Sequence, residues 1–300
     1  MVEVKFLKIA VPFVIIALLL RSIVFDWQEI VPLLYRVSPI LLIISFLFLL
    51  TIYPEAAFSW YVMLGKMGVK VGIRESFQVW ILSTASRYVP GAIWQYIGRV
   101  ELAKQMAEIP RNITVASLLF EIFIAIIAAV VVGFLGLYFL LVNNHENPIL
   151  IFVIPFPLIL LHPTLSSKII SFVARVLNKK LDWDMQKLGF FETIEIVPWY
   201  VANFLLNGVA LYFLILSFGI NLSSVQFFYL SGIYAISWVV GFISVFAPAG
   251  LGVTEATLAY FLSLSMSFPQ ATLIALSYRV LLTIAELLAF TIAFRLGGKS

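Results

Sequence analysis

Eight apolar runs, separated by short polar segments, dominate the chain. Several are about 20 residues long, which as an α-helix is enough to cross the roughly 30 Å of hydrocarbon in a bilayer. The pattern predicts an all-α, polytopic membrane helix bundle of about eight spans. The runs cover residues 6–24, 37–64, 113–142, 148–162, 194–217, 224–247, 254–266 and 270–294.

The composition supports a membrane protein. Hydrophobic residues make up 63% of the 300 positions and charged residues 11%, against about 25% charged residues in soluble domains. One water-soluble core cannot hide so much apolar surface, so we expect a single integral membrane domain over 1–300, with two related halves at about 1–145 and 146–300. No small-residue cleavage site follows the run at 6–24, so we interpret it as a retained first span.

The residue content also excludes several kinds of chemistry. The chain has no cysteine, which rules out disulfides, thiol catalysis and cysteine-ligated metals. His145 and His162 have no partners at metal-ligand spacing, and the sequence contains no Gly-x(4)-Gly-Lys-Ser/Thr motif for nucleotide binding. We therefore predict no metal, no cofactor, no nucleic-acid partner and no direct use of ATP.

The basic residues predict the orientation of the chain. Lysine and arginine gather in 66–111, in 163–193 and at both termini, whereas the loops at 143–148, 219–224 and 265–270 contain neither. By the positive-inside rule, both termini are predicted to be cytoplasmic, in the cell membrane of a prokaryote.

This orientation affects three further segments. The region 75–108 is predicted to enter and leave the membrane on the cytoplasmic side as a re-entrant hairpin. The basic segment 166–181 is either an amphipathic helix at the cytoplasmic interface or an ordinary solvated loop. The segment 224–266, with its break at 244–266, is either a re-entrant pair or two full spans.

Two helix breaks interrupt the apolar pattern in similar ways. Pro90 and Gly91 lie in the stretch RYVPGAIWQYIGRV, and Pro248 to Gly252 read PAGLG. Irregular backbone at membrane depth persists only where it is buried in protein or lines a wet cavity. Each break also exposes the amino end of a following half-helix, which attracts anions. Paired breaks indicate a transporter binding site; the alternative is a pair of kinks needed only for packing.

Charged residues inside the apolar runs also favour a binding site near the two breaks. Glu121, Glu255, Arg279 and Glu286 lie within or beside predicted spans, and ionisable groups there mark functional sites by default. The alternative is a structural ion pair between two helices, such as Arg279 with Glu121 or Glu255. Glu286 lies two helical turns beyond Arg279 and is expected to have a separate packing role.

The first break is flanked by further candidates. Arg87 and Arg99 lie on either side of it, and Trp94 and Gln95 follow it. These two side chains either contact a head group or anchor the segment at the interface. We predict no catalytic residue. The predicted substrate-binding residues are Arg87, Pro90, Gly91, Trp94, Gln95, Arg99, Glu121, Pro248, Gly250, Gly252, Glu255 and Arg279.

Both breaks resemble motifs of the lysylphosphatidylglycerol synthetase transmembrane-region family. The first, Arg87-Tyr-x-Pro-Gly-x-Ile-Trp with Gly98-Arg99, is similar to the family's Pro-Gly-x-Ile/Val stretch that ends in Gly-Arg. The second, Pro248-Ala-Gly-Leu-Gly-Val-Thr-Glu255, is similar to Pro-Gly-Gly-Ile-Gly-x-x-Glu and is the more specific. The resemblance covers almost the whole chain. It implies the flippase-like integral domain of bacterial multiple peptide resistance factors, which also occurs alone, in some cases linked to dolichol-phosphate sugar pathways.

The chain departs from the family pattern at two positions. Ala249 stands where the family usually has a glycine, and Ile122 follows Glu121 where the family often has an arginine. The second departure makes Arg279 the expected partner of Glu121. The sequence has no counterpart of the soluble domain that uses aminoacyl-tRNA, so we expect lipid movement rather than lysyl transfer.

Three functions remain open at this point. The favoured one is a flippase for an anionic or sugar-bearing lipid, either a polyprenyl-phosphate-linked glycolipid or a modified phospholipid. The partner is then a lipid with a phosphate head group in the bilayer. The second is an integral membrane enzyme of polyprenyl-lipid glycosylation, for which Asp182 and Asp184 form an Asp-x-Asp pair that can bind Mg²⁺. The third is a non-catalytic partner subunit of a glycosyltransferase.

Overall fold

The computed structural model describes residues 2–89, 93–143, 190–223 and 226–297, with side chains for 12–89, 93–138, 193–223 and 226–296. This part of the chain is helical and contains no strand. The α-helices are α1 (Val2–Phe25), α2 (Trp27–Tyr35), α3 (Pro39–Lys66), α4 (Ile73–Thr84), α5 (Trp94–Ala107), α6 (Arg111–Asn143), α9 (Phe190–Ser217), α10 (Gln226–Ile243), α11 (Val253–Leu262) and α12 (Phe268–Gly297). Two 3₁₀ turns, η1 (Ala85–Tyr88) and η4 (Pro248–Gly250), complete the order.

Five of these helices, α3, α6, α9, α10 and α12, are long and apolar enough to cross a membrane. They match the predicted runs at 37–64, 113–142, 194–217, 224–247 and 270–294. The polytopic helical bundle that the sequence predicts is therefore confirmed, and the protein is a multi-pass membrane protein.

The other three predicted runs have different outcomes. The apolar part of α1, Pro12–Phe25, is shorter than these five helices. The run at 254–266 forms α11, whose 10 residues extend only about 15 Å, or half the hydrocarbon thickness. The run at 148–162 and the basic segment 166–181 lie outside the described residues. The count of eight spans stays a prediction.

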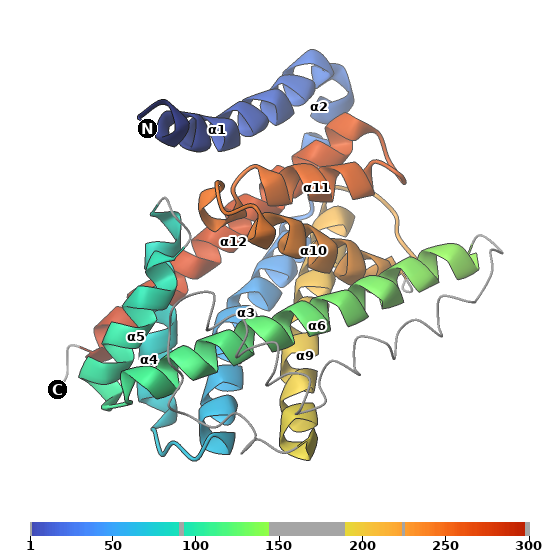
Figure 1. Ribbon diagram of the computed structural model, residues 1–300. Coiled ribbons are helices and arrows are strands. Elements are labelled where there is room, and N and C mark those ends of the chain that lie inside the picture. Colours follow the sequence, from blue (N-terminus) through green and yellow to red (C-terminus); the bar gives the residue numbers. More distant parts are fainter. Residues whose placement is uncertain (1, 90–92, 144–189, 224–225, 298–300) are drawn as a thin grey trace.

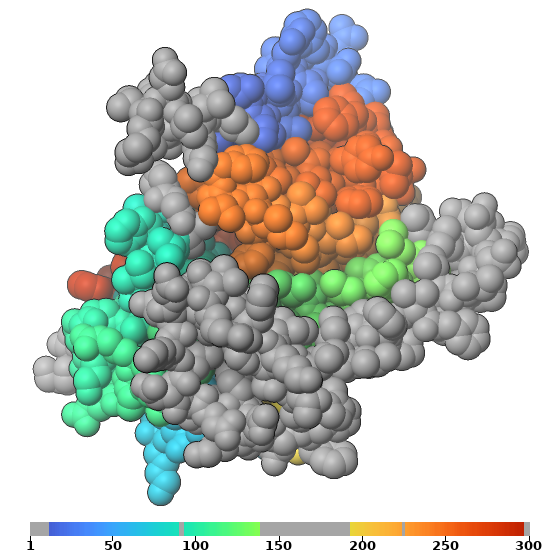
Figure 2. All heavy atoms as spheres, in the orientation of Figure 1, coloured from blue at the N-terminus to red at the C-terminus, as the bar shows by residue number. Residues whose placement is uncertain are grey.

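The long helices pack closely in two pairs. α3 lies against α9, where the Ser45 hydroxyl donates to the Ala210 carbonyl at 2.7 Å. α6 lies against α10, and a Cβ added at Gly136 or Gly232 would come within 2.7 Å of the Cα of the other glycine. Such contacts between small residues let membrane helices approach closely. Figure 1 shows α1 and α2 at one edge, where α1 packs against α11 and α12. Figure 2 shows the orange atoms of the segment from α10 to α12 between the blue atoms of α1 and α2 and the green atoms of α6.

The predicted hairpin at 75–108 is present as a helix, a break and a helix. α4 and η1 lead into the break, and α5 packs back against α4 (Figure 1). Neither helix is among the long apolar ones that can cross a membrane. Pro90 and Gly91, at the break itself, lie outside the described residues.

The second break turns the chain between α10 and α11. Ala249 adopts φ 52°, and Gly250 and Gly252 adopt φ 66° and 79°, a left-handed conformation that favours glycine. This explains why the family usually has glycine at the position of Ala249. Contacts between η1 and η4 bring the two breaks together, although more than 150 residues separate them in the sequence.

Candidate functional site

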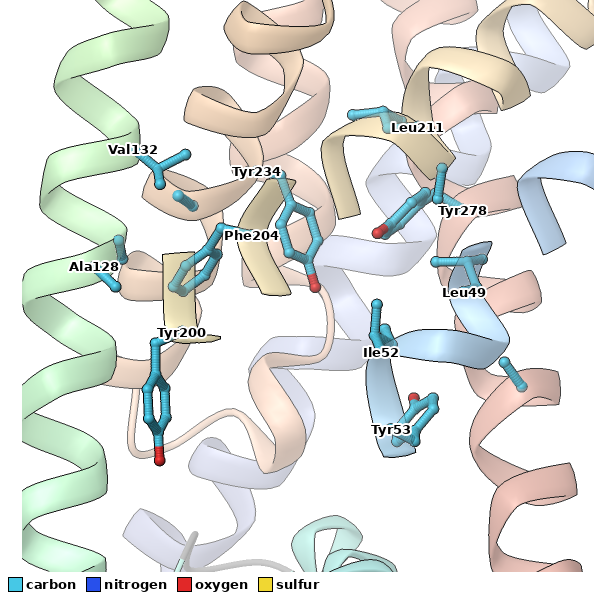
Figure 3. Packing of buried hydrophobic residues seen from close by; sticks show 14 of the residues in the cluster. Leu49, Ile52, Tyr53, Ala128, Val132, Tyr200, Phe204, Leu211, Tyr234 and Tyr278 are labelled. Atoms are coloured by element: carbon cyan, nitrogen blue, oxygen red, sulfur yellow. The ribbon is translucent and has the colours of Figure 1, made fainter. Parts of the chain in front are cut away.

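A cavity of about 260 Å³ lies between the helices where the two breaks meet. Its wall takes residues from α3, α6, α9, α10 and α12 and from both broken segments. A water molecule occupies about 30 Å³ of liquid, so the cavity has room for roughly nine waters or for one polar head group. Figure 3 shows that Tyr53, Tyr200, Tyr234 and Tyr278 come from four different helices around this region.

Arg279 on α12 faces the second break from inside the cavity. Its Nη1 lies 3.2 Å from Oε1 of Glu255, and both Nη atoms donate to the Ala249 carbonyl at 3.3 and 3.4 Å. The other oxygen of Glu255 accepts the backbone N–H of Gly252 at 2.5 Å. Glu255 therefore closes the start of α11 and neutralises the arginine at the same time.

Arg99 on α5 is the most fully enclosed of the three arginines at the site. Its side chain is 4% exposed and donates through Nη1 to Oε2 of Glu121 at 2.5 Å. Its Nε donates to the Ser83 hydroxyl at 3.1 Å, and its guanidinium lies 4.9 Å from the Trp80 ring centroid. Trp80 Nε1 also donates to Oε1 of Glu121 at 3.0 Å. The prediction that Arg279 is the partner of Glu121 was therefore wrong. Spacing on single helices does not determine which helices meet, and α5 folds back against α6.

Arg87 in η1 is the third arginine that lines the cavity. Its Nε lies 3.3 Å from Oε1 of Glu286, whose Oε2 accepts the Tyr88 hydroxyl at 2.7 Å. This agrees with the expectation of a separate packing role for Glu286, because its carboxylate joins the first broken segment to the last long helix. Glu286 lies behind Arg87 rather than in the cavity wall.

A fourth ion pair, at the surface of the hairpin, provides a contrast. Arg111 lies 3.0 Å from the carboxylate of Glu101, and both side chains are largely exposed. Hydrogen bonds from Gln105 and Arg111 lower the pKa of Glu101 below its ordinary value. The pair touches neither break and no part of the cavity wall.

The structure gathers most of the predicted site residues in one place. Seven of the twelve line the cavity: Arg87, Gln95, Arg99, Glu121, Gly250, Glu255 and Arg279. Pro248 and Gly252 shape the second break without lining the cavity. Trp94 is 47% exposed on α5, away from the cavity wall. Pro90 and Gly91 lie outside the described residues, as do Asp182 and Asp184. That these residues bind substrate stays a prediction.

One polar side of the cavity was not predicted from the sequence. Glu55 on α3 lines it together with Tyr200, Asn203 and Asn207 on α9. Glu55 lies inside an apolar run, so the rule that singled out Glu121 would have found it. The three residues on α9 recur at intervals of three and four, which puts them on one helix face.

Tyr200 has a further property. It is 7% exposed, and its hydroxyl has no hydrogen-bond partner among the described residues. Figure 3 shows the hydroxyl pointing away from Ala128 and Val132. Buried polar groups normally have partners, so this hydroxyl is available to a molecule in the cavity. Across the described residues, no group of three His, Cys, Asp or Glu side chains could hold a metal ion.

Comparison with known proteins agrees with this architecture. The family model described as "Lysylphosphatidylglycerol synthase TM region" matches residues 6–289. The match includes both breaks and all the charged residues that line the cavity. No curated protein matches the chain.

Proposed function

The chain belongs to the lysylphosphatidylglycerol synthase transmembrane-region family, and we propose that it moves an anionic or sugar-bearing lipid between the two leaflets of the membrane. The lipid is a polyprenyl-phosphate-linked glycolipid or a modified phospholipid. One observation carries the proposal: three arginines line a single cavity among membrane helices, at the point where two broken helices meet. Ionisable residues at membrane depth mark substrate pathways.

The size of the cavity determines which part of the lipid enters. Pockets that enclose a drug-sized ligand measure about 300–1,000 Å³, and this one measures about 260 Å³. A phosphate with a small polar group fits that space, whereas acyl or polyprenyl chains do not. The chains therefore stay in the bilayer while the head group crosses among the helices.

The three arginines are held with different strengths, which gives them different roles. Arg99 combines a 2.5 Å ion pair with a hydrogen bond and a nearby tryptophan ring, so it positions the hairpin. Arg87 and Arg279 make longer contacts with their carboxylates, at 3.3 and 3.2 Å, and have more exposed side chains. These two can turn from a carboxylate to an incoming phosphate.

The second break adds a partial positive charge near Arg279. α11 begins at Val253, and the first N–H groups of a helix have no partner within it. Thr254 and Gly250 at this end line the cavity. Helix amino ends attract phosphate for this reason. We place both termini in the cytoplasm of a prokaryotic cell, from the distribution of lysine and arginine.

The first test is to identify the lipids that the purified protein retains. Mass spectrometry of wild type, Arg279→Ala and the control Arg295→Ala is expected to find one phosphate-bearing lipid enriched in wild type and control and lost from Arg279→Ala. Arg295 lies on the same helix, at its exposed last turn, outside the cavity wall. Bulk membrane lipids in all three samples would count against the proposal and favour a partner subunit.

The alternative that the protein is a membrane enzyme can be tested with a different variant. Replacing both Asp182 and Asp184 with asparagine would abolish a Mg²⁺-dependent glycosyl transfer and leave lipid movement unchanged. Movement is measured in vesicles that carry a trace of fluorescent phosphatidylglycerol, by chemical quenching of the outer leaflet. Loss of movement in the double Asp variant, together with normal movement in Arg279→Ala, would refute the proposed site.

A further inference from the structure

Glu55 differs from every other glutamate that lines the cavity. Its carboxylate accepts the Ser59 hydroxyl at 2.7 Å and Nδ2 of Asn203 at 2.5 Å. Glu121 and Glu255 each pair with an arginine, whereas no lysine, arginine or histidine among the described residues lies within ion-pair distance of Glu55. An acidic side chain in the middle of a long apolar helix therefore has only neutral partners.

Two opposing effects act on the protonation of such a group. Burial favours the neutral carboxyl, because an unpaired charge loses its hydration. The hydrogen bonds from Ser59 and Asn203 favour the carboxylate. An arriving anionic head group adds negative charge nearby and so favours the protonated carboxyl.

The orientation of Asn203 indicates which cation the site takes. Its Nδ2 donates to the Ile52 carbonyl at 3.1 Å as well as to Glu55. A backbone carbonyl only accepts, so the amide must turn its NH₂ group towards α3. Hard metal cations need several oxygen ligands, and here a donor occupies one side of the carboxylate. A proton needs no such set of oxygen ligands.

A chain of hydrogen bonds connects Glu55 to the helix that carries Arg279. Asn207 Nδ2 donates to the Asn203 carbonyl at 2.8 Å, and the Tyr278 hydroxyl donates to Oδ1 of Asn207 at 2.6 Å. Tyr278 precedes Arg279 directly in the sequence. A change of charge at Glu55 thus acts on α3, α9 and α12 together.

The cavity wall holds other titratable groups around Glu55. On the helices packed against α3, those that line the cavity are Tyr200 of α9, Glu121 of α6, and Tyr278 and Arg279 of α12, with Tyr53 on α3 itself. Among the described residues, α4 adds none. Arg87 and Arg99 face the cavity from the hairpin, and each has its own glutamate.

We propose that Glu55 takes up a proton from water on one side of the membrane and releases it to water on the other, so that lipid movement is driven by a proton gradient. This inference rests on the proposed function. It requires no oxidant, metal or covalent step, because only a proton is exchanged between the carboxylate and water.

The test uses the full-length protein in vesicles of phosphatidylcholine and phosphatidylglycerol with a trace of fluorescent phosphatidylglycerol. If one proton accompanies each lipid, a gradient of one pH unit shifts the distribution of the label between leaflets by up to ~10-fold. Wild type should approach this shift. Glu55→Gln, which keeps the shape and one acceptor oxygen for Asn203 and places its NH₂ group at the Ser59 oxygen, should show none. The control Glu195→Gln removes an exposed glutamate of α9 that pairs with Lys66, and should behave as wild type.

A second measurement reports on the proton directly. The infrared C=O band of a protonated carboxyl, followed as pH is varied, should contain a titrating component in wild type that is missing from Glu55→Gln. This readout holds even if the label does not move. Failure of the label to move would count against movement of phosphatidylglycerol, whereas the proton site is judged by the infrared band. Three outcomes would overturn this inference without affecting the proposed function. They are lipid movement that does not depend on the pH gradient, lipid movement driven by a sodium gradient instead, and an infrared titration that is unchanged in Glu55→Gln.

Discussion

The Arg99–Glu121 pair leads to a stability prediction that can be worked out from its surroundings. We consider the substitution Glu121→Gln, which removes the counter-charge of an arginine whose side chain is only 4% exposed. Removing one partner of a buried ion pair costs about 3–5 kcal/mol. The glutamine oxygen can still accept from Arg99 or Trp80, which recovers about 1 kcal/mol. The expected loss in unfolding free energy is therefore about 2–4 kcal/mol.

The double variant Arg99→Met with Glu121→Leu provides the decisive comparison. Replacing both members of a buried pair by apolar residues is often neutral, so we expect this variant within about 1 kcal/mol of wild type. If the two side chains did not interact, the losses in unfolding free energy of the two single substitutions would instead add, as they do for distant mutations. Glu101→Gln, which breaks the exposed pair with Arg111, serves as the control and should give no resolvable change.

We follow unfolding in detergent micelles by tryptophan fluorescence and check refolding at each step. The proteins compared are wild type, Glu121→Gln, Glu101→Gln, the double variant and its two single variants, Arg99→Met and Glu121→Leu. Equal stabilities for Glu121→Gln and Glu101→Gln would refute the argument from burial. A double variant that loses the sum of the two single losses would refute the direct pairing of Arg99 with Glu121.

Three further substitutions test other parts of the structure by the same unfolding measurement. Ala249→Gly should stabilise the protein by about 1 kcal/mol, because a left-handed conformation costs a non-glycine residue about that much; a loss would contradict the assigned backbone. Gly232→Val should destabilise it by at least about 1–3 kcal/mol, because its side chain meets the backbone of Gly136; an unchanged value would mean that α6 and α10 lie further apart. Tyr88→Phe should cost about 1.5–3 kcal/mol, since it removes a hydrogen bond to the Glu286 carboxylate, and a neutral result would place that hydroxyl elsewhere.

The long helices and both breaks could be predicted because they depend on local properties. An apolar run of sufficient length must form a helix in lipid, since its backbone has no other hydrogen-bond partners. Proline and glycine interrupt such a helix wherever they lie, which is why the breaks near Pro90 and Pro248 were found. The match of α3 and α9 to their predicted runs follows from the same reasoning.

The pairing of charges could not be predicted in this way. Spacing along one helix shows which residues share a face, but not which helix that face meets. Glu121 meets Arg99 because the hairpin folds back against α6, and Glu286 meets Arg87 because η1 reaches the last long helix. Glu55 is a different case. Its isolation in an apolar run was visible in the sequence, and only its lack of a basic partner required the structure.

The link between Arg87 and Glu286 also has a consequence for biosynthesis. Arg99 and Glu121 are 22 residues apart, so they can meet as soon as the hairpin and α6 leave the ribosome. Tyr88 and Glu286 are 198 residues apart, which at ~5–20 residues per second corresponds to a delay of roughly 10–40 s. The Arg99–Glu121 pair can hold the hairpin against α6 early, whereas Arg87 is fixed only when α12 is inserted. A chain stalled before α12 leaves the ribosome therefore has a cavity that lacks Arg279 and in which Arg87 is not yet paired with Glu286.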